Sequence, residues 1–206
     1  MSLPLRLRGL APIVSASTRL LVLGSFPGAA SLASQQYYAH PQNQFWKILE
    51  AIWPSRPYVA GLKSYEKRSE WLLERGLGVW DVYASCERDG SLDTAIRHAE
   101  TNDFASLLSR CPNLHVIAHN GAESFKHAPR VLASLSAASA SVGVAMSAAG
   151  PPQGAKAPSG GSAAHAMASV GVPAFKLPST SPANASWCFE RKLAAWREVI
   201  VAAGLA

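Results

Sequence analysis

The chain has 206 residues, of which 49% are apolar, and a formal net charge of +6. This length and apolar content suffice for one well-packed core, so we expect a single domain over residues 1–206. The positive charge favours a polyanionic partner, and the three widely spaced cysteines argue against a disulfide framework, a zinc site or an iron–sulfur site.

The sequence contains no charged segment followed by an apolar stretch, as in a secretory leader, and no uncharged run apolar enough to span a bilayer. Cysteines without an obvious disulfide partner are typical of a reducing compartment. We therefore expect a cytoplasmic protein that has no membrane partner.

In chain order, short apolar runs of the length of buried strands alternate with segments of helical periodicity. The expected strands cover residues 20–24, 78–83, 114–118 and 172–177. The expected helices cover residues 44–53, 65–75, 101–110, 122–135 and 185–203. This alternation predicts an α/β fold in three layers (αβα), in which helices cover both faces of a central four-stranded, mainly parallel sheet.

Residues 136–169 differ from the rest of the chain, because nearly all of them are Ala, Ser, Gly or Pro. They provide few bulky apolar side chains to offset the entropy that is lost on ordering, so we expect a flexible surface insertion. The alanines at its start are also compatible with an extension of the preceding helix.

Four loops follow the expected strands and contain most of the candidate functional residues. They cover residues 24–28, 81–85, 119–121 and 178–184. In parallel sheets, ligands bind at the carboxyl ends of the strands. We therefore expect the four loops to meet at one edge of the sheet and to form a single site.

The first of these loops has the sequence GSFPG, whose two glycines and one proline allow backbone amides to approach a ligand closely. It is followed at residues 37–46 by YYAHPQNQFW. Aromatic and amide side chains in such a loop suit a flat heterocycle, since rings stack on its face and amides hydrogen bond its edge. The alternative is an ordinary strand-to-helix loop whose aromatic residues belong to the core.

The segment GSFPGAASLASQQYYAHPQNQFWKIL, at residues 24–49, resembles the first motif of the uracil-DNA glycosylase superfamily. Three later segments, GVWDV, VIAHNG and PSTSPAN, agree with that superfamily in the same order. The mismatch-specific branch is similar around HPxNxFW, but it has an Asn at the position of Phe26. GSFPG, YYAHPQNQFW and PSTSPAN together resemble the hypoxanthine-DNA glycosylase family, which also lacks that amide.

The resemblance implies a monofunctional DNA N-glycosylase of base excision repair, which hydrolyses the bond between deoxyribose and a flipped, deaminated base, in the first place hypoxanthine. The implied partner is double-stranded DNA that contains a deaminated or mismatched base. A monomer with no cofactor and no metal, located in the cytoplasm near the nucleoid, is expected on the same ground.

The resemblance also identifies candidate residues. Asn43 matches the Asn of HPxN and is the candidate catalytic residue, which either orients water or donates to the departing base; the alternative is a helix cap. The candidate residues of the base pocket are Ser25, Phe26, Tyr38, Asp81 and Asn120. Tyr38 matches the aromatic residue that stacks on the flipped base, and its alternative is a core tyrosine.

The other pocket candidates also have structural alternatives. Phe26 contributes a wall through its side chain, for which simple packing is the more ordinary role, and Ser25 contributes a backbone amide. Asp81 either lines the pocket or caps a turn, and Asn120 either lines the pocket or serves as a turn residue before a glycine. His40 is a structural residue rather than a general acid, because the loop constrains the His-Pro pair.

The segment PSTSPAN matches the second motif, which contacts phosphates and the gap in the double helix. The candidate DNA-binding residues are Ser179, Ser181, Ala183 and Asn184. Ser179 stands where uracil-specific members have a catalytic His. Ala183 stands where a wedge side chain such as Leu enters the vacated base stack, and a methyl group fills that gap poorly.

Two other functions are compatible with these residues. One is a glycosylase that prefers uracil, thymine or xanthine in mismatches, and the other is a non-catalytic DNA-binding module on the same fold. The missing amide of the first motif favours the second of these. A Rossmann or flavodoxin-like enzyme fits less well, because the first loop lacks GxGxxG.

Overall fold

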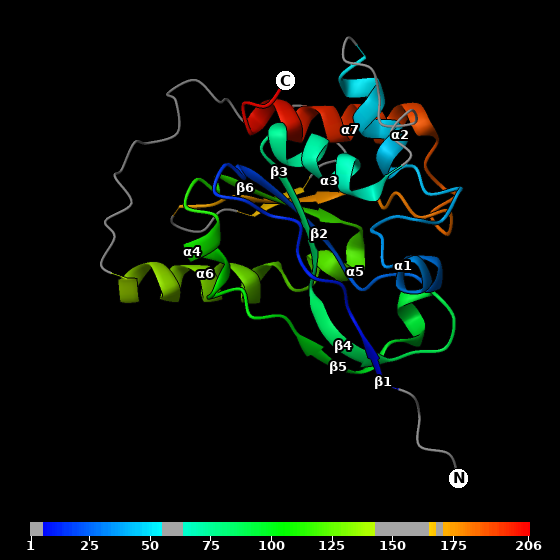
Figure 1. Cartoon of the computed structure of the whole chain (residues 1–206), viewed down its shortest axis with the longest axis horizontal. Helices are drawn as coiled ribbons and strands as arrows, with labels where there is room; N and C mark the ends of the chain where they lie inside the picture. The colour runs from blue at the N-terminus through cyan, green and yellow to red at the C-terminus, as the bar shows by residue number, and fades with distance from the viewer. Residues whose placement is uncertain (1–5, 55–63, 143–164, 168–170) are drawn as a thin grey trace.

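The computed structural model of the chain describes residues 6–54, 64–142, 165–167 and 171–206. It has the three-layer α/β architecture expected from the sequence, with a sheet in the middle and helices on both sides (Figure 1). The strand order of this main sheet is β3-β2-β6-β8-β7. Its strands are β2 (Leu20–Gly24), β3 (Leu77–Asp81), β6 (Val116–Asn120), β7 (His165–Met167) and β8 (Ala174–Leu177).

The four strands expected from the sequence pair in parallel, in the order β3-β2-β6-β8. The short strand β7 adds a fifth, antiparallel strand at the edge of the sheet, within the segment expected to be a flexible insertion. The expected four-stranded parallel sheet is confirmed. The additional edge strand β7 was not foreseen, because an Ala- and Ser-rich segment has no apolar alternation that would indicate it.

The core is divided between the two faces of the sheet. Side chains alternate along a strand, so Leu20 and Val22 face one helical layer, whereas Leu21 and Leu23 face the other. All four of these side chains are buried, as expected for the central strand of a parallel sheet that is covered on both sides.

The helices form two layers (Figure 1). The layer over Leu20 and Val22 consists of α2 (Phe45–Ile52), α3 (Tyr65–Glu74) and α7 (Phe189–Ala202). The opposite layer consists of α4 (Leu107–Arg110) and α6 (Ala128–Val142). The short α1 (Ala29–Ser34) directly follows the first loop and was not expected from the sequence.

A second, antiparallel sheet of three strands was also missed. It consists of β1 (Arg6–Arg8), β4 (Tyr83–Glu87) and β5 (Arg97–Thr101), in the order β1-β4-β5. The expected helix over 101–110 is wrong in its first half, since Thr101 belongs to β5 and only residues 107–110 are helical. The sequence RHAET of β5 is mostly exposed and has no apolar face, so only its pairing with β4 makes it a strand.

The expected helix over 122–135 consists of two helices, α5 (Ala122–Phe125) and α6. Pro129 lies at the second residue of α6 and has no N–H to continue a helix from residue 125, so a new helix starts there instead. The last helix, expected over 185–203, begins at Phe189.

Helix α6 continues to Val142 and so occupies the first seven residues of the segment 136–169. The flexible insertion is therefore wrong for these residues, and the alternative that the alanines extend the preceding helix is confirmed, because alanine-rich sequence continues a helix at little entropic cost. The rest of that segment, apart from β7, lies outside the described residues. None of the helices in the described part of the chain has both the length and the apolar character that crossing a bilayer needs.

Trp196 on α7 connects the core to the loop that carries PSTSPAN. Its buried ring packs edge-to-face on Phe45 with a centroid distance of 5.7 Å, and its indole N–H donates to Pro178 O at 3.3 Å. We expect Trp196→Ala to lower the free energy of unfolding by roughly 3–5 kcal/mol, because the cavity cannot be refilled. Urea unfolding would measure this effect.

The matched control is Val201→Ala, a truncation on the same helix at a side chain that is 53% exposed. It should change the free energy of unfolding by less than about 0.5 kcal/mol. An equal loss in both variants would show that α7 contributes helix stability alone and does not anchor the core.

Candidate functional site

A pocket lies at the carboxyl edge of the main sheet, where the four parallel strands end. The final residues of these strands, Gly24, Asp81, Asn120 and Leu177, all line it. Its volume is about 900 Å³, which is enough for a nucleobase together with its sugar. A position at this edge is where α/β sheets bind their ligands.

All ten candidate residues from the sequence line this one pocket. They are Ser25, Phe26, Tyr38, Asn43, Asp81, Asn120, Ser179, Ser181, Ala183 and Asn184. One of the four expected loops is different, because residues 83–87 form strand β4, and the nearby segment that reaches the pocket is 91–94. The roles of the ten residues in binding and catalysis stay predictions, since position alone does not show what a side chain does.

Phe26 occupies the position where mismatch-specific relatives have a water-positioning amide. Its side chain is buried in the core cluster below the first loop, and the guanidinium of Arg88 lies 5.0 Å from the centre of its ring. Arg88 also donates to Pro27 O, which ties the loop to β4. The packing role of Phe26 is therefore visible, and its side chain offers no polar group to the pocket.

Asp81 provides a carboxyl group at the end of β3. The residue is buried, and its Oδ2 has no hydrogen-bond partner among the described residues. Burial raises the pKa of Asp81 to about 7, the nearby Asp93 adds to the rise, and Arg88 opposes it. Both the neutral and the ionised forms are therefore accessible near neutral pH, which is unusual for an aspartate.

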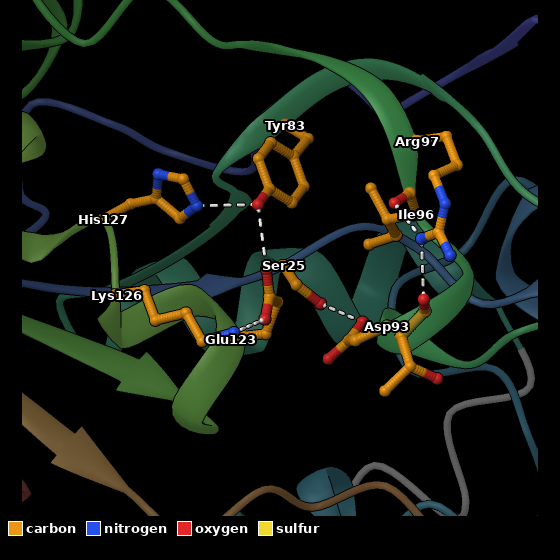
Figure 2. A network of polar contacts seen from close by, with 9 residues as sticks. Ser25, Tyr83, Asp93, Ile96, Arg97, Glu123, Lys126 and His127 are labelled. Carbon is orange, nitrogen blue, oxygen red and sulfur yellow. Dashed lines mark hydrogen bonds and ion pairs between the residues drawn. The ribbon is translucent and has the colours of Figure 1, made fainter.

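Asp93 is a second pocket carboxylate, and sequence reasoning missed it. It begins the 3-10 helix η1 (Asp93–Ala95), and its Oδ1 accepts a hydrogen bond of 2.6 Å from Ser25 Oγ (Figure 2). Burial raises the pKa of Asp93, while the Ser25 hydroxyl lowers it. The first loop thus obtains from a distant segment the acidic group that its own sequence lacks.

A polar network lies beside Asp93 (Figure 2). The hydroxyl of Tyr83 is 3.0 Å from Glu123 Oε1 and 2.6 Å from His127 Nε2. Lys126 donates to the other oxygen of Glu123 at 2.6 Å. This network fixes the start of α5 against β4 and occupies the Glu123 carboxylate, so Glu123 is a less available base than Asp81.

Tyr38 has one face of its ring occupied. It stacks on Phe45 at a centroid distance of 4.0 Å, and its φ of 55° lies in the left-handed region that non-glycine residues rarely adopt. The Tyr38 hydroxyl is buried, and no described residue hydrogen bonds it. Burial raises the pKa of this phenol, which is therefore a neutral hydrogen-bond donor.

Asn43 makes a side-chain contact at the start of α2, one residue before the N-cap Gln44, so it is close to but not the N-cap that was its structural alternative. Its Oδ1 accepts from the N–H of Phe45 at 3.0 Å, at the start of α2. The amide Nδ2 has no partner in the described part of the chain, and the residue is partly exposed at the pocket. His40 Nδ1 accepts from the N–H of Gln42 at 3.2 Å, which agrees with a structural role for this histidine.

Asn120 is engaged at both ends of its amide. It donates to Thr180 Oγ1 and accepts from the N–H of Thr180, both at 2.9 Å. This pair of bonds holds the loop after β8 against the end of β6. This contact differs from the structural alternative expected for Asn120, a turn residue before Gly121. Its amide keeps one N–H and one lone pair, so a role in the pocket stays a prediction.

The loop at residues 178–184 is shaped by its own side chains. Ser179 Oγ accepts from the N–H of Ser181 at 3.2 Å, and Asn184 Nδ2 donates to Ser179 O at 3.0 Å. Below the loop, the ammonium group of Lys192 donates to Asn184 O at 3.0 Å. These bonds preorganise the loop and leave its outer surface, which includes Ala183, exposed.

Sequence reasoning missed a group of pocket residues beyond the four expected loops. They include Ser91, Leu92, Asp93, Thr94, Glu123, Lys126, Lys176 and Trp187. The only signal in the sequence was the polar segment DGSLD at residues 89–93, which is typical of a turn and gives no indication of a site. Among the described residues, no three His, Cys, Asp or Glu side chains are grouped so that they could hold a metal ion.

Comparison with known proteins agrees with the geometry. The model of the uracil DNA glycosylase superfamily matches residues 11–200 of the chain. A hypoxanthine DNA glycosylase from Methanosarcina barkeri is 37% identical over 124 residues, which cover 59% of this chain and 75% of that protein. A hypoxanthine DNA glycosylase from Methanosarcina acetivorans is 36% identical over 123 residues, with the same two coverages of 59% and 75%.

A solved structure has the same overall fold. It is the solution NMR structure of a Methanosarcina acetivorans protein provisionally described as a uracil DNA glycosylase. The two chains superpose with a TM-score of 0.67 and are 26% identical, over 98% of this chain and 99% of the other. The similarity therefore extends over the sheet and both helical layers.

The close contact between Gly24 and Asp81 can be tested by adding one methyl group. A Cβ at Gly24 would overlap Asp81 Oδ1, whereas a Cβ at Gly28 would be 3.6 Å from its nearest neighbour, Ser91 Oγ. We expect Gly24→Ala to lower the free energy of unfolding by roughly 1–3 kcal/mol, because the buried carboxyl must move. Gly28→Ala is the matched control and should be nearly neutral in urea unfolding; similar losses would contradict the tight packing of Asp81.

The raised pKa of Asp81 has a consequence for stability. In the unfolded chain this carboxyl titrates near 3.8, whereas in the folded protein it titrates at about 7. Between these values the unfolded state has released a proton that the folded state retains. The contribution of Asp81 to stability therefore falls as the pH rises through this window, and it stays constant above pH 7.

We expect Asp81→Asn to remove this pH-dependent loss of stability. As the pH rises from about 4 to 8, the free energy of unfolding of the variant should increase relative to that of the wild type by roughly 1–4 kcal/mol. Urea unfolding at a series of pH values measures the difference. Asp89→Asn, at an exposed carboxyl on the neighbouring hairpin, is the control and should leave the pH profile unchanged. A constant offset between wild type and Asp81→Asn at all pH values would contradict the assignment.

Proposed function

The chain belongs to the uracil DNA glycosylase superfamily, and from this premise we propose that it releases hypoxanthine from deoxyinosine in double-stranded DNA by hydrolysing the N-glycosidic bond. The observation that carries this proposal is the pocket at the carboxyl edge of the sheet, which collects all ten candidate residues. The identity of 37% to a hypoxanthine DNA glycosylase supports the choice of base.

The polar groups of the pocket suit the hydrogen-bonding edge that deamination gives to a purine base. Deamination of adenine replaces an acceptor nitrogen and an amino donor by an N–H donor and a carbonyl acceptor. Asp81 Oδ2 is an acceptor and the Tyr38 hydroxyl a donor, and neither has a hydrogen-bond partner among the described residues. The other carboxyl oxygen, Asp81 Oδ1, and the Tyr38 hydroxyl both lie close to Gly24. Unpaired buried polar groups are costly, so a base that pairs with both gains affinity, whereas adenine presents the opposite pattern.

The reaction begins when the nucleotide leaves the base stack and enters the pocket, at a cost of a few kcal/mol that is lowest for a mispaired base. The glycosidic bond then breaks toward an oxocarbenium-like sugar, and negative charge develops on the departing base. Only groups that bind this charge distribution better than the ground state increase the rate. A deaminated purine departs as an anion more readily than adenine does.

Asn43 acts through its amide in this proposal. Its Oδ1 is already occupied by the N–H of Phe45, while its Nδ2 is free to donate to the departing base. A carbonyl oxygen has two lone pairs, so Oδ1 retains capacity for one hydrogen bond from the attacking water. The two roles predict different responses to substitution.

The surroundings of the reaction follow from the same proposal. The substrate is duplex DNA with a deaminated base, and the formal net charge of +6 favours its phosphate backbone. The protein acts as a monomer in the cytoplasm, at the nucleoid, where its substrate lies. It uses no cofactor, since hydrolysis needs only water and preorganised polar groups.

The test is base release under single turnover from duplexes that contain hypoxanthine, uracil, xanthine, thymine or adenine at one position. We expect release of hypoxanthine to exceed that of uracil by about tenfold or more, and no release of adenine. Dominant uracil or xanthine release would identify a different glycosylase of the same superfamily. DNA binding without release of any base would instead identify a non-catalytic module.

Two substitutions of Asn43 separate its roles in this assay. Asn43→Ala removes both roles and should lower the release rate by about 100-fold or more. Asn43→Asp retains the contact at the start of α2 but loses the N–H donor, so an equally large loss with unchanged thermal stability indicates donation to the departing base. Retained activity in Asn43→Asp indicates the water-orienting role. Asn113→Ala, at an exposed amide distant from the pocket lining, serves as the control.

A further inference from the structure

Leu92 is an unusual residue on the rim of the pocket. Its side chain is 58% exposed, although it belongs to the large apolar residues that normally seek the core. Among the described residues, the only other large apolar side chain with such exposure is Val201, on α7. Leu92 lines the pocket, whereas Val201 does not.

The loop that carries Leu92 is held firmly, so this exposure does not result from a loose segment. Ser91 Oγ accepts from the N–H of Ala29 at 2.9 Å, and Asp93 accepts from Ser25 at 2.6 Å, so both neighbours of Leu92 are bonded to the first loop and the start of α1. The carbonyl of Leu92 accepts from the N–H of Ala95 at 3.1 Å, which starts η1. A leucine fixed in this way presents its side chain to whatever enters the pocket mouth.

The second motif and the residues just after it do not offer an alternative to Leu92. Ala183 has only a methyl group at the place where an apolar side chain would fill a gap in DNA. Trp187 is partly buried, and the guanidinium of Arg191 covers its ring at 4.4 Å from the ring centre. Leu92 is therefore the large apolar side chain of this rim that is exposed and is not covered by another side chain.

We propose that Leu92 is the side chain that enters the base stack of DNA when the target nucleotide rotates into the pocket. The inference rests on the proposed glycosylase function, since it assigns to that reaction a residue that lies outside both sequence motifs. The partner of Leu92 is a DNA duplex, and the Leu92 side chain fills the gap that the everted nucleotide leaves in its base stack. Lys176 lines the same pocket and supplies positive charge for the adjoining phosphates.

The physical reason is the cost of leaving a vacancy in the stack. Proteins that separate base steps insert apolar side chains such as Leu, Ile, Phe or Met, which replace part of the lost stacking. A leucine already exposed in the free protein leaves water when it enters the gap, and this favours the everted state. Because the backbone around Leu92 is already fixed, this loop loses little conformational entropy when DNA binds.

The experiment compares Leu92→Ala with the wild type on duplex and single-stranded DNA that contain the same deoxyinosine. Single-turnover release from the duplex should fall by about tenfold or more, because the everted state loses its filler, whereas release from the single strand should change less than about twofold. Leu92→Met should keep most of the duplex activity. Val201→Ala, at the other exposed apolar side chain, should change neither rate.

A second measurement does not depend on bond cleavage. The duplex contains 2-aminopurine beside a deoxyinosine whose sugar has a 2′-fluorine, which resists hydrolysis. Eversion of the inosine unstacks the 2-aminopurine, so its fluorescence should rise with the wild type and with Leu92→Met, but only weakly with Leu92→Ala. Thermal unfolding of Leu92→Ala should match the wild type, because the side chain is exposed.

The outcomes distinguish this inference from the proposed function. If Leu92→Ala retains both the duplex rate and the fluorescence rise, Leu92 is not the wedge, and the glycosylase function stands. If the wild type releases no base but raises the fluorescence in a way that needs Leu92, the wedge stands and the function fails. A wild type that binds the duplex without any rise in fluorescence overturns the wedge.

Discussion

The parallel pairing of β2 with β3 and β6 is the constraint on which the site depends. This register places Gly24 opposite Asp81 and ends all the parallel strands at one edge of the sheet. The loop after each strand must therefore open into the same space. Gly24 has no side chain, and this allows the Asp81 carboxyl to lie directly against the backbone of β2. The parallel sheet therefore determines where the site lies, whereas the loop residues determine which chemical groups line it.

The electrostatics of the pocket follow from burial. Asp81 and Asp93 are two carboxylates in a confined space, with the buried guanidinium of Arg88 as the cation that moderates them. The raised pKa of each carboxyl shows that burial outweighs this cation. Such a pocket accepts an N–H donor of a ligand more readily than a phosphate. The phosphates of DNA are thus expected to remain at the rim, and the base to enter the interior.

The first loop is also where this chain departs from mismatch-specific members of its superfamily. Phe26 belongs to the core, and the polar side chains Asn43, Asp81 and Asp93, which line the pocket, come from three different segments. Modest stabilisation from each of several groups suits a substrate whose base is a good leaving group. The rim of the pocket likewise comes from separate segments, namely the second motif and the hairpin that carries Leu92.

Local sequence was enough for the elements whose residues carry their own signal. The apolar run of β2, the periodicity of α2 and the motifs around Tyr38 and Asn43 indicated the strands, the layered fold and most of the pocket lining. Strand β5, Asp93 and Leu92 were not predictable, because their positions depend on partners distant in sequence. Strand β5 forms by pairing with β4, and Asp93 accepts a hydrogen bond from Ser25 in the first loop. Periodicity reports which face of an element is buried, whereas only the folded chain determines which distant loops share a space.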